Sequence, residues 1–149
     1  AFVVALLGAG LLASWRLGRP GASLRGVLAT IVAPVIAIWV LAAFVLMGAD
    51  SGQRTDLMLG RTWKVCATNI AILSVPIFAA SFWAMKALAP TRLRLAGAAA
   101  GLLAGAAAAV VYTLHCPELA APFLGIWYVL GMLIPTAVGA LIGPRVLRW

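Results

Sequence analysis

The stretch from Leu114 to Glu118 gathers three reactive side chains of different kinds. It reads Leu-His-Cys-Pro-Glu and contains the only histidine, one of two cysteines and one of three acidic residues. The other cysteine is Cys66. Two thiols can form a disulfide in an oxidising compartment, and they can also bind a soft metal ion with His115 as a third ligand. The two cysteines, with or without His115, are therefore the first candidates for a working site.

Enzyme chemistry finds little support elsewhere in the chain. The sequence contains no HExxH zinc motif, no Walker A loop and no nucleophile elbow. A Ser-His-Asp triad is not credible, because the single histidine follows an apolar run and both aspartates lie in another segment. A disulfide-exchange enzyme would normally use a CxxC motif, which is absent. We therefore expect a protein that is not an enzyme.

The composition indicates that lipid surrounds most of the chain. Hydrophobic residues make up 65% of the 149 positions and charged residues only 9%, whereas soluble domains contain roughly 45–50% apolar and about 25% charged residues. The net charge of +8 does not predict nucleic-acid binding, because the basic residues lie in short segments between apolar runs. We expect an integral membrane protein that contacts lipid and does not bind nucleic acid directly.

Apolar runs predict the elements that must position the reactive residues. A helix needs about 20 apolar residues to span a bilayer, and backbone amides in hydrocarbon need partners within their own segment, which favours helices. The predicted fold is all-α, a polytopic transmembrane helical bundle that forms one domain over residues 1–149. Its five helices are expected at about 1–15, 27–47, 66–85, 95–114 and 123–142.

The basic residues predict the orientation in the membrane. Lys and Arg in short loops mark the cytoplasmic side. Eight of them fall on one side of the predicted bundle, and the other side receives three together with all three acids. The C-terminus and the segments 16–26 and 86–94 are therefore expected in the cytoplasm, with loops 48–65 and 115–122 in the periplasm of a bacterial inner membrane. Since this topology leaves Ala1 outside, we expect a sixth helix before it.

Small residues predict how two of the helices pack. Gly97, Gly101 and Gly105 recur every four residues in the fourth predicted helix. The fifth helix repeats the spacing with Gly131, Pro135, Gly139 and Gly143. Such stripes let helix backbones approach closely in lipid. We expect a packing seam, which could close one bundle or join two copies in a homo-oligomer.

The two cysteines are expected at one depth in the membrane. Cys66 opens the third predicted helix and Cys116 ends the fourth, and the helices meet at an inner loop around Pro90. From Pro90 the two cysteines are about 36 and 39 Å away along antiparallel helices. If the glycine face of the fourth helix meets the third helix, the pair could be close enough for a disulfide. From the residues alone, inert packing, a structural disulfide and a redox- or metal-responsive pair all remain open.

Several sequence motifs carry a resemblance to a known family. The most specific are the Trp-x-x-Cys element at Trp63 and the His-Cys-Pro-Glu element at His115. The others are RTWKVC (61–66), ILSVP (72–76), APTR (89–92), the Ala/Gly-rich helix, Trp127-Tyr128 and the closing GPRVLRW (143–149). With these motifs the sequence resembles the NrsF family of bacterial membrane anti-sigma factors over essentially the whole chain.

The resemblance implies a function for the thiols. It implies six transmembrane helices and a cytoplasmic N-terminal segment that holds an extracytoplasmic-function sigma factor away from RNA polymerase. It also implies release of that sigma factor under heavy-metal or oxidative stress, with a cysteine pair at the positions of Cys66 and Cys116. No sigma-binding residue can be named, since the chain as given lacks the first helix and the N-terminal segment.

Two other functions compete with this hypothesis. A small membrane transporter or permeation subunit would use the proline-containing helices to line a polar path. A thiol–disulfide membrane oxidoreductase would require a bound quinone or turnover of a partner's disulfide. No cofactor is certain, and a soft metal ion on the cysteine pair is the one candidate.

Overall fold

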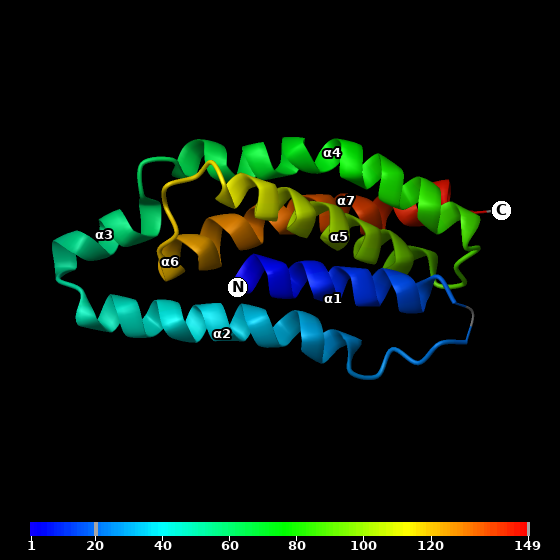
Figure 1. Ribbon diagram of the computed structural model, residues 1–149, viewed down its shortest axis with the longest axis horizontal. Helices are drawn as coiled ribbons and strands as arrows, with labels where there is room; N and C mark the ends of the chain where they lie inside the picture. The colour runs from blue at the N-terminus through cyan, green and yellow to red at the C-terminus, as the bar shows by residue number, and fades with distance from the viewer. Residues whose placement is uncertain (20, 149) are drawn as a thin grey trace.

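The computed structural model describes residues 1–19 and 21–148, and the chain is helical without strands across these ranges (Figure 1). The predicted all-α fold is therefore confirmed. Four helical segments are long and apolar enough to cross a membrane, and α1 is a shorter apolar helix. The elements in chain order are α1 (Phe2–Leu17), α2 (Val27–Gly48), α3 (Ser51–Leu59), α4 (Trp63–Ala87), α5 (Leu93–Thr113), α6 (Ala121–Phe123), the π-helical η1 (Leu124–Tyr128) and α7 (Val129–Val146).

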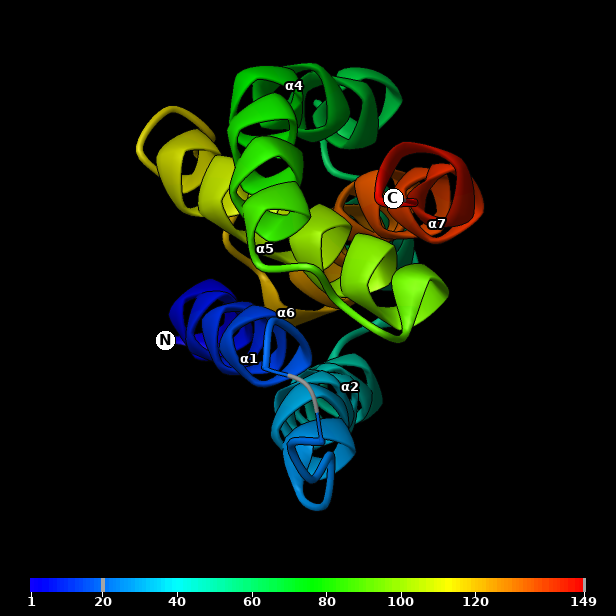
Figure 2. The same ribbon diagram turned by 90° about the vertical axis from the view of Figure 1, so that its right-hand side faces the viewer.

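Helix α5 forms the centre of the bundle. It packs against α1, α4 and α7, which surround it in the end-on view (Figure 2). In the most apolar window of α5, 67% of the residues are buried, against 11% in α2. The difference follows from the side chains: α5 is built largely from Ala and Gly, which let neighbours approach, whereas α2 carries large aliphatic and aromatic residues suited to lipid.

Glycines bring the backbones of α5 and α7 into direct contact. A Cβ on Gly101 would lie 2.7 Å from the Pro135 carbonyl carbon, and one on Gly97 would lie 2.9 Å from the carbonyl carbon of Gly139. Gly105 faces Met132 and Pro135 in the same way. Since real Cβ atoms do not approach so closely, no larger residue fits without moving a helix.

Gly131 belongs to a different contact. A Cβ there would lie 3.0 Å from Ile70 Cβ, on α4 rather than α5. The α5–α7 seam therefore uses Gly139 and Gly143 from α7, together with Pro135, and Gly131 serves the α4–α7 contact.

The last span contains a π-helical turn that ties α2 to the bundle. Residues Ala121 to Val146 form one continuous candidate span, and η1 lies within it. The indole Nε1 of Trp39 on α2 donates to the Gly125 carbonyl oxygen at 2.9 Å. A π-turn widens the helix and alters its backbone hydrogen bonding, which suits a carbonyl that accepts from outside.

Helix α3 forms the first part of the candidate span Ser51–Ala87 and differs from the rest of it in polarity. It is a polar helix without buried residues, and it connects α2 to α4 at the end of the molecule opposite the C-terminus (Figure 1). The three acids lie at this end, on or next to α3 and in the loop after α5. We call it the acidic end and the opposite one, which holds the α1–α2 and α4–α5 connections, the basic end.

Candidate functional site

Both cysteines lie in one apolar cluster at the acidic end. Cys66 is in the first turn of α4 with no exposed surface, and Cys116 follows α5 with 5% of its surface exposed. Both are free thiols. They share the cluster with Tyr112 of α5, Tyr128 of η1 and Phe123 of α6, among others. The thiols are therefore screened from bulk water and from large reactants.

Backbone hydrogen bonds at the end of α5 position Cys116. Helix α5 ends at Thr113, and the amides of His115 and Cys116 both donate to the Tyr112 carbonyl, at 3.0 and 2.9 Å. Pro117 cannot donate to a continuing helix and disfavours helical geometry before it. The condition set for a close pair, that the glycine face of α5 meets α4, is not met: that face meets α7, and Cys116 lies just beyond the end of α5.

Glu118 fastens the loop after α5 to the start of α4. Its carboxylate accepts hydrogen bonds from the Arg61 amide, the Thr62 amide (3.1 Å) and the Thr62 hydroxyl. It therefore places a negative charge from a distant segment beside the N-terminus of α4, which the helix dipole favours. We call Gly60, Arg61, Thr62 and Glu118 the Glu118 latch.

Two features follow from the geometry of the latch. Partial desolvation raises the pKa of Glu118, but the hydrogen bonds from Arg61 and Thr62 outweigh it, and the net effect is a lowered pKa. Gly60 has a φ of 56°, and a Cβ there would lie 2.6 Å from the Glu118 carboxylate. The site therefore requires a glycine both for its backbone conformation and for space.

The latch and the thiols share Thr62. Its Oγ1 lies 3.8 Å from the Cys116 Sγ, which also lies 3.8 Å from the Glu118 carbonyl oxygen, within reach of a weak S–H donor. A change at the Cys116 sulfur would therefore act directly on two groups that hold the latch. The sequence marked Glu118 as part of a reactive stretch, yet nothing in it indicated Thr62 as its partner.

Tyr128 is a buried polar residue that the sequence reasoning named as part of a family motif and not as a site residue. It has no exposed surface and lies in the same cluster as the cysteines, and its hydroxyl has no hydrogen-bond partner among residues 1–19 and 21–148. Its ring contacts those of Tyr112 and Phe123, with centroids 5.9 and 6.4 Å apart. An orphaned buried hydroxyl is costly, and it leaves one donor free beside the thiol pair. In the sequence, Tyr128 follows Trp127, and such a pair is also typical of an aromatic belt at the membrane surface. The sequence therefore did not indicate that Tyr128 is buried beside the cysteines.

His115 does not join the thiols in this structure. Its side chain is exposed, with the ring 6.4 Å from the Tyr112 ring in a shallow pocket that Asn69 also lines. Across residues 1–19 and 21–148, no three His, Cys, Asp or Glu side chains form a group that could hold a metal ion. The structure therefore brings the two thiols into one cluster, and the three-ligand set with His115 stays a prediction.

Comparisons with known proteins decide the family. A family model described as "Negative regulator of sigma F" (NrsF) matches residues 1–149. The chain belongs to the NrsF family. It is 59% identical over 148 residues to a probable anti-sigma-F factor NrsF of Azospira oryzae, a match that covers 99% of this chain and 70% of that protein.

A second relative confirms the relationship at lower identity. The anti-sigma-F factor NrsF of Caulobacter vibrioides is 38% identical over 152 residues, which cover the whole of this chain and 71% of that protein. No solved structure is significantly similar to the chain. The NrsF resemblance inferred from the motifs is thus confirmed, and the family is one of regulators, in agreement with the expectation that the chain is not an enzyme.

The structure also bears on the two competing functions for this NrsF-family chain. The direct backbone contact between α5 and α7 leaves no room for a polar path along the central seam, as a transporter would require. Burial of Cys66 and Cys116 keeps a partner protein's disulfide from reaching either sulfur. Neither alternative gains support from the geometry.

Proposed function

We propose that this chain is the membrane-embedded part of an anti-sigma factor. It holds an extracytoplasmic-function sigma factor at the bacterial inner membrane and releases it when Cys66 and Cys116 react with a heavy-metal ion or an oxidant. The observation that carries the proposal is a family match over the whole chain combined with two free thiols in one buried cluster.

Sequestration of a sigma factor rests on the family. Both relatives are named anti-sigma-F factors, and this chain covers about 70% of each. The binding segment is expected before Ala1, in the cytoplasm, and the bundle anchors it to the membrane. The same bundle could act as one copy or in a homo-oligomer.

Sensing rests on the chemistry of the paired thiols. A hydroperoxide would oxidise the two thiols to one S–S bond. The two thiol protons and two electrons would reduce an organic hydroperoxide to an alcohol and water, or hydrogen peroxide to two waters. A soft metal ion would instead displace the two protons and bridge the two sulfurs. Either reaction draws Cys116 towards Cys66 and changes the surroundings of Thr62.

Transmission rests on the latch. Thr62 contacts both Cys116 and Glu118, so movement of the Cys116 sulfur weakens the hydrogen bonds that fasten the loop after α5 to α4. Helix α4 can then shift against α5, while the glycine seam holds α5 and α7 together as one unit. A switch needs an element with two positions. Here that element is α4, which takes one of two positions against the unit formed by α5 and α7.

A sigma-dependent reporter tests the proposal. Cells carrying the full-length protein should keep the reporter silent and switch it on after cadmium or peroxide treatment. Cys66→Ser and Cys116→Ser should each keep the reporter silent under stress, with unchanged protein abundance. Removal of the protein should switch the reporter on without stress. Normal induction in both cysteine variants would reduce the thiols to packing residues, and a silent reporter after removal of the protein would exclude the anti-sigma function itself.

A further inference from the structure

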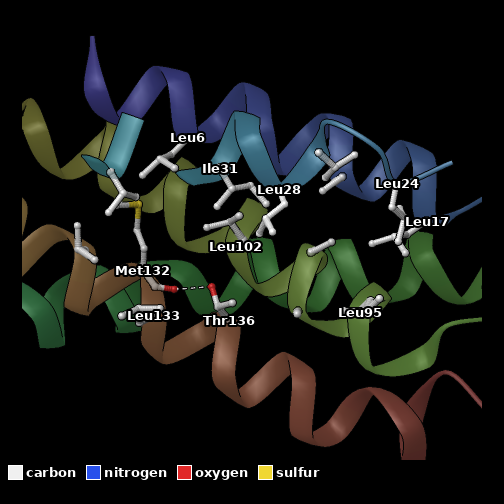
Figure 3. Close-up of a pocket in the computed structure, with 16 residues that line it drawn as sticks. Leu6, Leu17, Leu24, Leu28, Ile31, Leu95, Leu102, Met132, Leu133 and Thr136 are labelled. Atoms are coloured by element: carbon white, nitrogen blue, oxygen red, sulfur yellow. Dashed lines mark hydrogen bonds between the residues drawn. The ribbon is translucent and has the colours of Figure 1, made fainter. Parts of the chain in front are cut away.

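An apolar groove separates α2 from α5 and α7. Helix α2 packs against α1, α6 and η1, whereas α5 and α7 form the opposite wall of the groove. The groove has a volume of about 410 Å³. Figure 3 shows Leu28 and Ile31 of α2 across from Leu102 of α5 and Met132 of α7.

The lining excludes water as the natural occupant. Thr136 is the one residue with a hydroxyl among the sixteen that line the groove, and that hydroxyl donates to the Met132 carbonyl oxygen at 2.7 Å (Figure 3). A water molecule needs two to four polar partners, which this lining does not offer. An empty groove would lose the dispersion contacts of its walls. A hydrocarbon chain satisfies both conditions.

Positive charge gathers where the groove reaches the basic end. Leu17, Leu24 and Leu95 line that part of the groove. Each has an arginine as its direct neighbour in sequence, namely Arg16, Arg25 and Arg94 respectively. All three acidic side chains, Asp50, Asp56 and Glu118, are at the acidic end, so none of them lies near these arginines.

Two of the three arginines are free to meet an anion. Arg16 donates to the Ser23 carbonyl oxygen at 2.9 Å and so holds the α1–α2 connection. The side chains of Arg25 and Arg94 are exposed. Basic pockets between transmembrane helices bind the head groups of anionic lipids, and each arginine near the membrane surface contributes to the affinity.

We propose that this groove is a binding site for an anionic phospholipid. One acyl chain lies between α2 and the α5–α7 wall, and the phosphate lies between Arg25 and Arg94. The lipid completes the packing of α2, whose own contacts leave most of its surface unburied. This site is independent of the thiols and of the proposed sensing mechanism.

Native mass spectrometry of the full-length protein tests the site. The protein, released from detergent, is titrated with phosphatidylglycerol and with phosphatidylcholine of the same acyl chains. We expect one phosphatidylglycerol to be retained in preference to phosphatidylcholine. The double variant Arg25→Gln with Arg94→Gln should lose about tenfold in affinity for phosphatidylglycerol and little for phosphatidylcholine.

Two further variants make the test specific. Lys86→Gln with Arg145→Gln removes the same charge at the same end of the bundle. Lys86 lies on α4, which does not line the groove, and Arg145 lies on α7 past Thr136, the last residue of that helix in the lining. Lipid binding by this variant should therefore be unchanged. Ala98→Leu fills the groove from α5 and should weaken the binding of both lipids, with the thermal midpoint in detergent reporting that the variant is folded. Three results would overturn the proposal. The wild type could retain both lipids equally, or the two double variants could lose affinity equally. The third is that no lipid is retained because another segment of the full-length protein fills the groove.

Discussion

At the scale of single residues, Glu118 joins two segments that are 56 positions apart in sequence. One carboxylate accepts three hydrogen bonds from Arg61 and Thr62, and the same threonine lies against Cys116. The sequence placed the two cysteines at about one level because each lies at a similar distance from Pro90 along its helix. It could not place Glu118 on Thr62, since the turn at Pro117 and the backbone of Gly60 decide that contact and neither leaves a periodic pattern.

Replacing Glu118 should weaken the latch without changing its shape. Glu118→Gln removes the charge and should lower the free energy of unfolding by about 1–3 kcal/mol, because three donors lose a charged acceptor. Thermal or denaturant unfolding in detergent measures the loss. Asp56→Asn on the exposed α3 makes the same charge change outside the latch and should have little effect. Equal stability of the wild type and Glu118→Gln would show that the latch contributes nothing.

The same pair of proteins should differ in a pH-dependent way. The pKa of Glu118 in the folded protein lies below its ordinary value of 4.5, so the unfolded chain binds the proton more tightly. The stabilisation is therefore complete above about pH 5 and is lost as the pH falls through the lowered pKa. The difference in unfolding free energy between wild type and Glu118→Gln should stay constant from neutral pH to about pH 5 and shrink below about pH 4. A difference that grows on acidification would contradict the assigned direction.

Gly60 offers a second test of the latch from the other partner. Gly60→Ala should destabilise the protein by about 1–3 kcal/mol, because the backbone conformation at φ 56° and ψ −162° is nearly exclusive to glycine and the new Cβ meets the Glu118 carboxylate. Gly52→Ala is the matched control: Gly52 is an exposed residue within α3 with open space around it. That control should be neutral or slightly stabilising, and the pair can be compared by unfolding in one detergent.

At the scale of elements, the α5–α7 seam is the most closely packed contact between helices described above. Gly97→Ala should lower the unfolding free energy by about 1–3 kcal/mol, since its Cβ would enter the backbone of α7 at Gly139 and Gly143. Gly8→Ala on α1 adds the same methyl group where no atom lies within 4 Å and should not destabilise. A Gly97→Ala variant as stable as the wild type would show that the seam opens without cost.

Hydropathy predicted the long apolar helices. It did not predict α3 or η1, because neither element is marked by an apolar run of its own. The apolar runs are long enough to define the major helices. The helix α3 escaped notice because it is short and polar, with no apolar stripe to mark it. The π-turn η1 adds one residue to a turn inside an apolar run, and the periodicity of such a run is too weak to reveal it.

At the scale of the whole molecule, charge divides the bundle into two ends. The basic end carries eight Lys and Arg residues and the acidic end three, beside all three acids. The predicted topology places the basic end in the cytoplasm. An impermeant maleimide should therefore label Gln53→Cys from outside and Thr91→Cys only after permeabilisation, in a background where Cys66 and Cys116 are serine. The reverse pattern would invert the topology and place the thiols at the cytoplasmic face.

The most direct test of the sensing mechanism follows the sigma factor itself. Inverted membrane vesicles containing the full-length protein are loaded with the purified sigma factor, treated with hydrogen peroxide, which crosses the membrane to the thiols at the luminal end, and sedimented. The account predicts that most of the sigma factor stays with untreated vesicles and moves to the supernatant after treatment, whereas vesicles with Cys66→Ser or Cys116→Ser retain it in both conditions. Release from the serine variants equal to that from the wild type would contradict the account.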